Sequence, residues 1–219
     1  MKNFARSVAL AVLIVGGRQG IARADTFRLT SGHVDYESYG LGNLQLVSGT
    51  PPSVDFYLSG GLDAARGGRF DAAACFTACA PGSMLSLGAN WTGSEINASA
   101  VVRGVQYDPV NATLALAGSV RLPAASLSGG PWTQEVDAPF TLTGSVVLPT
   151  GGRGAFSADG FTGAGTARVF VMPSANGWSV SSVLYDVTPT PEPTTILLLG
   201  SGLVAIRART YRRGRTRNS

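Results

Sequence analysis

Two cysteines, Cys75 and Cys79, are the only thiols in this 219-residue chain, and three residues separate them. Their C-x3-C spacing differs from the C-x2-C motif of thiol oxidoreductases, and no histidine follows as in haem attachment. A structural zinc site needs four ligands, of which two cysteines supply half. In an oxidising compartment such a pair forms a disulfide by default. We therefore expect a disulfide that clips a small local loop, with free or redox-active thiols as the alternative.

Two pairs of acidic residues share an i, i+2 spacing: Asp35 with Glu37, and Glu135 with Asp137. This spacing places both acids of a pair on one face of a β-strand. Two opposed carboxylates could hydrolyse a glycosidic bond, but the same pattern is typical of a solvated strand face. His33 is the only histidine, and neither a G-x-S-x-G nor an H-E-x-x-H motif accompanies it. We therefore expect no catalytic residue, no cofactor and no metal site.

Aromatic side chains offer a third kind of chemistry, because exposed rings can stack on sugars. The candidates for ligand stacking are Trp91, Trp132 and Trp178, with Tyr36, Tyr39 and Tyr57 as further rings. Three tryptophans are an ordinary number for a chain of this length, so a role in the core is the competing interpretation. Burial of all three tryptophans would exclude a stacking platform.

The elements that position these residues are predicted to be strands. Nine short runs alternate apolar and polar residues or are rich in β-branched residues, and most are bounded by Gly, Pro, Asn or Ser. The runs are 27–29, 44–47, 54–58, 84–90, 96–107, 112–122, 138–148, 166–172 and 178–187. Without a helical period between them, they predict an all-β domain over residues 25–187, an antiparallel β-sandwich or jelly roll. The Gly- and Ala-rich segment 60–80 interrupts the pattern and is predicted to be a surface excursion.

An internal similarity supports this interpretation. Residues 112–123 match residues 138–149 at seven of twelve positions. Each copy carries a central glycine, Gly118 or Gly144, which is typical of a bulge or a close backbone approach. We expect two similar strands of one sandwich. A solenoid with a 26-residue repeat is the alternative, but two copies are fewer than stacking requires.

The C-terminal end has three parts in a fixed order: Pro191-Glu192-Pro193, an apolar run over 194–206, and a basic segment over 207–219. The run would make a helix of about 20 Å, whereas a hydrocarbon core of about 30 Å asks for about 20 residues. It is therefore predicted to be a short transmembrane helix of marginal length. The arginines that follow it form a stop-transfer signal, which favours a cytoplasmic end; they include Arg207, Arg209, Arg212 and Arg213. An ordinary single-span anchor is the alternative.

Residues 189–213 closely resemble the bacterial PEP-CTERM sorting signal, through the Pro-Glu-Pro triplet, the Leu/Gly-rich run and the arginine cluster. The resemblance implies recognition by exosortase, a membrane-embedded cysteine-type transpeptidase that processes the tail during export. It also implies a Gram-negative-type envelope and often a role in extracellular matrix. It implies nothing about the fold upstream.

The N-terminal end agrees with export. Lys2 and Arg6 precede an apolar run over 7–17, and Ala22 and Ala24 provide a small-x-small cleavage motif. These features predict a signal peptide over 1–24, with a helical apolar part, that signal peptidase cuts after Ala24. An N-terminal membrane anchor is the alternative.

The charge of the chain depends on these two ends. The whole chain carries a net charge of +4, but seven arginines and twelve acidic residues leave residues 25–190 at −5. A nucleic-acid-binding role needs a basic face for phosphate contacts, so it is not expected.

Together these patterns predict five regions: 1–24, 25–187, a proline-rich spacer over 188–193, 194–206 and 207–219. The expected protein is not an enzyme; it is exported, anchored transiently in the inner membrane through its C-terminal segment, and localised to the cell envelope, surface or extracellular matrix. We expect a structural or adhesive role, with exosortase and signal peptidase as partners during export. A carbohydrate-binding module for extracellular polysaccharide is the main alternative, and a small glycan hydrolase is the third.

Overall fold

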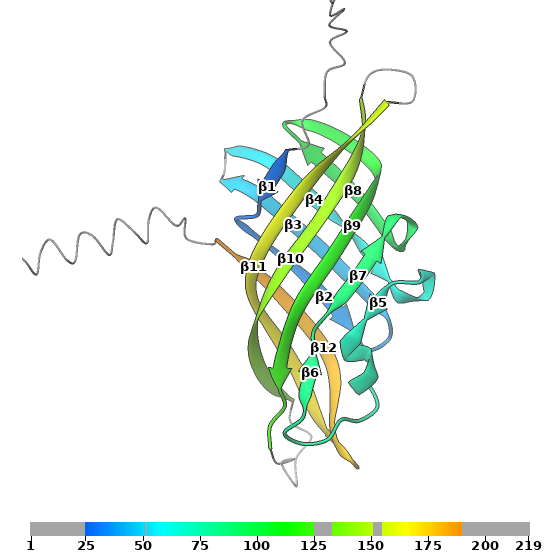
Figure 1. Cartoon of the computed structure of the whole chain (residues 1–219), viewed down its shortest axis with the longest axis vertical. Coiled ribbons are helices and arrows are strands. Elements are labelled where there is room, and N and C mark those ends of the chain that lie inside the picture. The colour runs from blue at the N-terminus through cyan, green and yellow to red at the C-terminus, as the bar shows by residue number, and fades with distance from the viewer. Residues whose placement is uncertain (1–24, 51, 125–132, 151–154, 190–219) are drawn as a thin grey trace, which may run out of the picture.

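The computed structural model describes residues 25–50, 52–124, 133–150 and 155–189 (Figure 1). Within them the chain forms twelve strands and three 3-10 helices. The strands are β1 (Thr26–Arg28), β2 (Ser31–Glu37), β3 (Leu41–Thr50), β4 (Ser53–Asp63), β5 (Arg69–Phe70), β6 (Met84–Ser86), β7 (Ala89–Thr92), β8 (Ile96–Val102), β9 (Val105–Arg121), β10 (Gln134–Thr150), β11 (Ala155–Ser174) and β12 (Gly177–Thr188). The helices are η1 (Ala64–Arg66), η2 (Asp71–Cys75) and η3 (Gly93–Glu95).

Eight of these strands form a closed antiparallel sheet. Each strand is hydrogen-bonded to the next in the order β2, β3, β4, β8, β9, β10, β11, β12. The ring is completed because β12 pairs with β2, with Val183 opposite Tyr36. Figure 1 shows the long strands β9, β10 and β11 running diagonally across one side, with β2, β3 and β4 behind them. Closure pairs the two edges that an open sheet would expose.

The all-β prediction is confirmed, but the expected division into two separate sheets is wrong for the described residues. Alternating apolar and polar residues bury one face of each strand in a sandwich and in a closed sheet alike, so the pattern does not distinguish the two folds.

Glycines allow neighbouring strands and side chains to approach closely in this sheet. A Cβ on Gly165 of β11 would lie 1.9 Å from the backbone oxygen of Asp186 in β12, and one on Gly144 would lie 2.2 Å from the ring of Phe161.

The two similar segments are neighbouring strands, as parts of β9 and β10. They run antiparallel, with Leu116 opposite Leu142. The central glycine of each lies opposite a large apolar residue of the other, since Gly118 faces Phe140 and Gly144 faces Leu114. The glycines therefore make room for a close pairing of two similar strands, and the solenoid alternative is wrong.

The core fills the inside of the ring with alternate side chains. Val34 and Tyr36 of β2 and Leu44 and Leu46 of β3 are at most 2% exposed. Burying one side chain of this size stabilises the fold by roughly 1.5–3 kcal/mol. Tyr36 also packs against Phe70, with ring centroids 4.2 Å apart. The core thus extends from the ring into the segment between β4 and β8.

That segment, residues 64–95, fills a gap in the ring between the far ends of β9 and β12. β9 extends beyond its partner β8, and there it pairs with β7 and then with β6. On the opposite side of the gap, β12 extends beyond β2. Its Trp178 forms a bridge with Cys79, in which the Cys79 N–H donates to the Trp178 carbonyl at 2.6 Å and the Trp178 N–H donates to the Cys79 carbonyl at 2.8 Å. The expected surface excursion is thus wrong for much of its length, because Phe70, Ala72 and Cys75 are buried.

The terminal predictions lie outside the described residues. They concern the signal peptide with Ala22 and Ala24, the motif Pro191-Glu192-Pro193, the helix over 194–206 and the basic segment 207–219. No helix in the described part of the chain is long and apolar enough to span a membrane.

Candidate functional site

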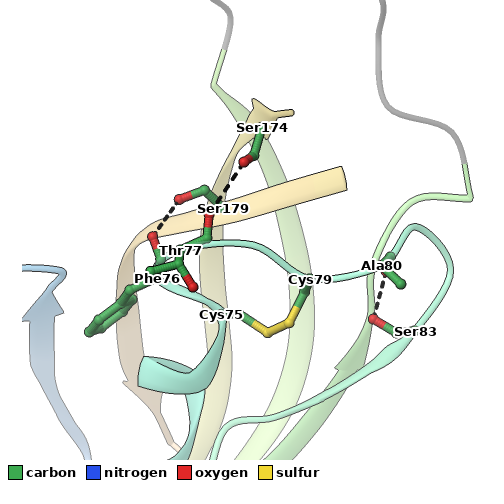
Figure 2. The surroundings of a disulfide bond; sticks show 8 residues. All are labelled: Cys75, Phe76, Thr77, Cys79, Ala80, Ser83, Ser174 and Ser179. Atoms are coloured by element: carbon green, nitrogen blue, oxygen red, sulfur yellow. Dashed lines mark hydrogen bonds between the residues drawn. A yellow bond between two sulfur atoms is a disulfide. The ribbon is translucent and has the colours of Figure 1, made fainter. Parts of the chain in front are cut away.

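The cysteines form a disulfide in the gap-filling segment (Figure 2). Cys75 ends η2 and Cys79 follows four residues later, with their Cα atoms 5.1 Å apart. The disulfide prediction is confirmed, and the alternative of free thiols is wrong, since no described cysteine is free. Cys75 is only 3% exposed, so the bond is a local clip on a packed segment.

Two serines attach the disulfide loop to the turn between β11 and β12, as Figure 2 shows. The hydroxyl of Ser179 donates to the carbonyl of Phe76 at 2.8 Å, and that of Ser174 donates to the carbonyl of Thr77 at 3.3 Å. Both acceptors lie between the two cysteines. The disulfide therefore shapes the loop that β12 holds in place, and it offers no thiol for chemistry.

The tryptophans do not form a stacking platform in the described residues. Trp91 and Trp178 are both 0% exposed, so their predicted role in ligand stacking is wrong. The indole N–H of Trp178 donates to the carbonyl of Pro123 at 3.0 Å. Trp91 packs against Tyr36, with ring centroids 5.6 Å apart. Trp132 lies outside the described residues.

A groove on the outer face of β2, β3, β4 and β8 is the best candidate for a binding site. Its volume is about 350 Å³. Two exposed apolar side chains line the groove: Tyr39, which is 69% exposed, and Leu41, which is 50% exposed. Gly61 lies in the middle of the lining, where an added Cβ would meet nothing closer than 3.9 Å. An exposed ring beside an open, side-chain-free stretch of backbone is suited to contact with a flat ligand.

The groove is acidic, with one basic residue. Its charged residues are Asp35, Glu37, Asp63, Glu95 and Arg66, and two amides, Asn43 and Asn97, also line it. The predicted placement of Asp35 and Glu37 on one strand face is therefore confirmed. Sequence reasoning missed Asp63 and Glu95, which reach the groove from β4 and η3.

Several of these acids already have partners within the protein. The Asp35 carboxylate accepts a hydrogen bond from the backbone N–H of Asn43. Asp63 accepts from the N–H of Ala65 at 2.9 Å and lies 3.2 Å from Arg66. Such acids shape local structure, and their free lone pairs can accept hydrogen bonds from a hydroxylated ligand. In the described residues, no group of three or more His, Cys, Asp or Glu could hold a metal ion.

The second acid pair, Glu135 and Asp137, belongs to a surface ion-pair network. Arg168 of β11 donates from Nε to Asp186 of β12 at 2.8 Å and lies 4.0 Å from Glu135. The hydrogen bond to Asp186 and the charge of Asp186 raise the pKa of Arg168, and Glu135 and Asp137 add to this effect. Exposed ion pairs of this kind contribute little to stability. His33 of β2 lies opposite Gln45 of β3 and opposite Asp186 of this network in the strand register.

Comparison with known proteins identifies the C-terminal end. Residues 189–213 match the PEP-CTERM protein-sorting motif. The chain therefore carries this motif, as its resemblance implied, and the motif begins directly after β12 ends at Thr188. No curated protein and no solved structure matches the chain.

Proposed function

We propose that this protein is sorted by exosortase to the cell surface or extracellular matrix, where its closed sheet has a structural or adhesive role and no catalytic activity. The PEP-CTERM motif carries the proposal, because it is the signature of exported, exosortase-processed proteins. It starts one residue after β12 ends, so all twelve strands of the described residues lie on its N-terminal side. Processing within the motif would remove none of these strands.

The route that follows has four steps. Signal peptidase removes residues 1–24, and residues 25–187 fold outside the inner membrane. Residues 194–206 hold the chain in that membrane while 207–219 remain cytoplasmic, and exosortase then acts on the motif. Two features of the fold suit this destination: a disulfide persists in an oxidising compartment, and a closed sheet offers few unpaired edges for aggregation.

Replacement of Glu192 by Gln tests the sorting step in a host that has exosortase. We expect the variant to keep its C-terminus through Ser219 and to stay in the inner membrane. Intact-mass measurement of the membrane and secreted fractions reads this directly. Glu135→Gln is the matched control, because it makes the same change on the outer face of β10. Secretion of a Glu192→Gln protein whose C-terminus is processed like that of the control would contradict the proposal.

A second candidate function is binding of a neutral polysaccharide in the outer groove. The exposure of Tyr39 and Leu41 beside carboxylate and amide acceptors favours it. An acidic polysaccharide would be repelled, since four carboxylates outnumber the single arginine of the lining. The ligand of this candidate is therefore a neutral glycan whose hydroxyls donate to the acids while a sugar face packs on Tyr39.

Co-sedimentation of the exported protein with an insoluble neutral glucan tests this second candidate. We expect Tyr39→Ala to reduce the bound fraction at least threefold. Phe156→Ala is the matched control, because Phe156 is 65% exposed and does not line the groove. Equal binding by the wild type and Tyr39→Ala, or stronger binding to alginate than to the glucan, would exclude it.

A further inference from the structure

Asp25, the residue directly after the expected signal-peptide cleavage point, is held at three positions by the fold. Its carbonyl accepts a hydrogen bond from the N–H of Gly160 in β11 at 2.7 Å. Its carboxylate forms an ion pair with Arg103 from the turn between β8 and β9. Its backbone nitrogen donates to Oδ1 of Asp159 at 3.3 Å. A residue at a free end is usually poorly ordered unless contacts of this kind fix it.

The partner of that nitrogen is a buried carboxylate. Asp159 is 3% exposed, and together with Ser48 it makes up the buried polar residues of the described chain. A buried carboxylate is costly unless it is hydrogen-bonded or paired with a positive charge. Arg103 forms its ion pair with the carboxylate of Asp25 and not with Asp159. The backbone nitrogen of Asp25 is therefore the group placed to compensate Asp159.

We propose that the bond between Ala24 and Asp25 is the processing site, and that the new α-ammonium of Asp25 forms an ion pair with the buried carboxylate of Asp159. Hydrolysis adds one water across this peptide bond: the carbonyl carbon of Ala24 takes the hydroxyl and becomes a carboxylate, and the Asp25 nitrogen becomes an amine that is protonated at neutral pH. The single amide donor is thereby replaced by an ammonium with three donors and a positive charge. Charge-assisted hydrogen bonds are roughly twice as strong as neutral ones.

The strand that follows connects this ion pair to the core. β1 runs parallel to β11, and Figure 1 shows it beside β11 at the upper end of the closed sheet. Its Phe27 ring stacks on Phe56 with centroids 5.0 Å apart, and Leu29 is 0% exposed. The hydroxyl of Ser48 donates to the carbonyl of Arg28 at 2.7 Å, which ties β1 to β3. Cleavage therefore strengthens the first attachment of the element that covers this end of the core.

The amino-acid composition provides a selective probe. Lys2 is the only lysine of the chain, and it lies within the expected signal peptide. The processed protein then has one primary amine, the α-amine of its first residue. Acetylation with an N-hydroxysuccinimide ester reports on that group alone, after hydroxylamine has reversed any tyrosine esters. Only the unprotonated amine reacts, so an ammonium that is paired and shielded reacts slowly.

The experiment uses the exported protein, purified after expression of the full chain. Intact mass should place its first residue at Asp25. The native wild type should be acetylated at least tenfold more slowly than in urea, because a pKa rise of one unit lowers the free-amine fraction about tenfold. Asp159→Asn should restore most of the urea rate under native conditions. Asp55→Asn, an equal charge change at an exposed position of β4, should behave as the wild type.

Three results would overturn the proposal. One is a mature protein that begins at a residue other than Asp25. Another is a wild-type α-amine that reacts equally fast in buffer and in urea, a comparison that needs no variant to fold. The third is a folded Asp159→Asn protein whose amine is as protected as that of the wild type. None of these depends on exosortase, so the sorting proposal stands or falls separately.

Discussion

Removal of one buried hydroxyl should measure how strongly the gap-filling segment is attached to the ring. Tyr185 of β12 is 0% exposed, and its hydroxyl donates to the carbonyl of Leu87 at 2.8 Å. Leu87 is itself 0% exposed, between β6 and β7, so no water replaces the lost donor. Leaving a buried carbonyl unsatisfied costs about 1–3 kcal/mol. We expect Tyr185→Phe to lower the free energy of unfolding by that amount.

Urea unfolding followed by tryptophan fluorescence provides the measurement, with thermal unfolding as a second probe. A loss of 1 kcal/mol corresponds to roughly 2–4 °C in Tm for a domain of this size. Tyr57→Phe is the matched control: its hydroxyl accepts from Nε2 of Gln45 at 2.9 Å in an exposed setting, so its loss should cost less than about 0.5 kcal/mol. Equal stability of the two variants would refute the attachment through Tyr185.

The same residue predicts an alkaline limit. Burial raises the pKa of Tyr185 well above its ordinary value of 10.0, and the negative charge of Asp71 adds to the shift. A group whose folded pKa is raised contributes stability that is complete below the unfolded pKa and is lost as pH rises beyond it. The stability advantage of the wild type over Tyr185→Phe should therefore be constant below about pH 9 and shrink above pH 10. An advantage that grows with pH would contradict this reasoning.

Two further predictions concern the loop and the ring. Replacing Cys75 and Cys79 together by Ala should cost about 2 kcal/mol, the chain-entropy value for so short a loop, and an unchanged urea midpoint would contradict it. Gly165→Ala should lower the free energy of unfolding by about 1–3 kcal/mol, because the added Cβ would overlap the backbone oxygen of Asp186. Gly61→Ala, whose Cβ would have open space, should be close to neutral in the same unfolding assay. Equal effects of the two substitutions would refute the close packing of β11 on β12.

Alternation in the sequence was sufficient to predict strands such as β9 and β10, because every second residue over 112–116 and over 138–142 is apolar and buried. The seven-residue strand β2 was missed, since none of the predicted runs covers residues 31–37. Alternation could not decide between a sandwich and a closed sheet, since that depends on which strands meet at the edges. The pairing of β2 with β12 joins residues about 150 positions apart, and no local pattern encodes such a contact. Short strands such as β5 were also missed, because two residues carry no period.

The candidate site was predicted only in part for a similar reason. Asp35 and Glu37 could be placed together because they share one strand. Asp63 and Glu95 enter the groove through the pairing of β3 with β4 and of β4 with β8, which the sequence does not reveal. The burial of Trp91 and Trp178 depends on the gap-filling segment, whose packing onto β9 and β12 was not expected.

Ring closure by β2 and β12 also sets an order of events. A chain that crosses a membrane from its N-terminus delivers β2 first and β12 last, so β2 waits unpaired on that side until residue 187 has emerged. Contacts so distant in sequence make folding slow. On the proposed route, the tail that begins at residue 189 would be at the membrane when β12 becomes able to pair with β2. Retention by that tail would give the unfinished protein time near the bilayer before its release.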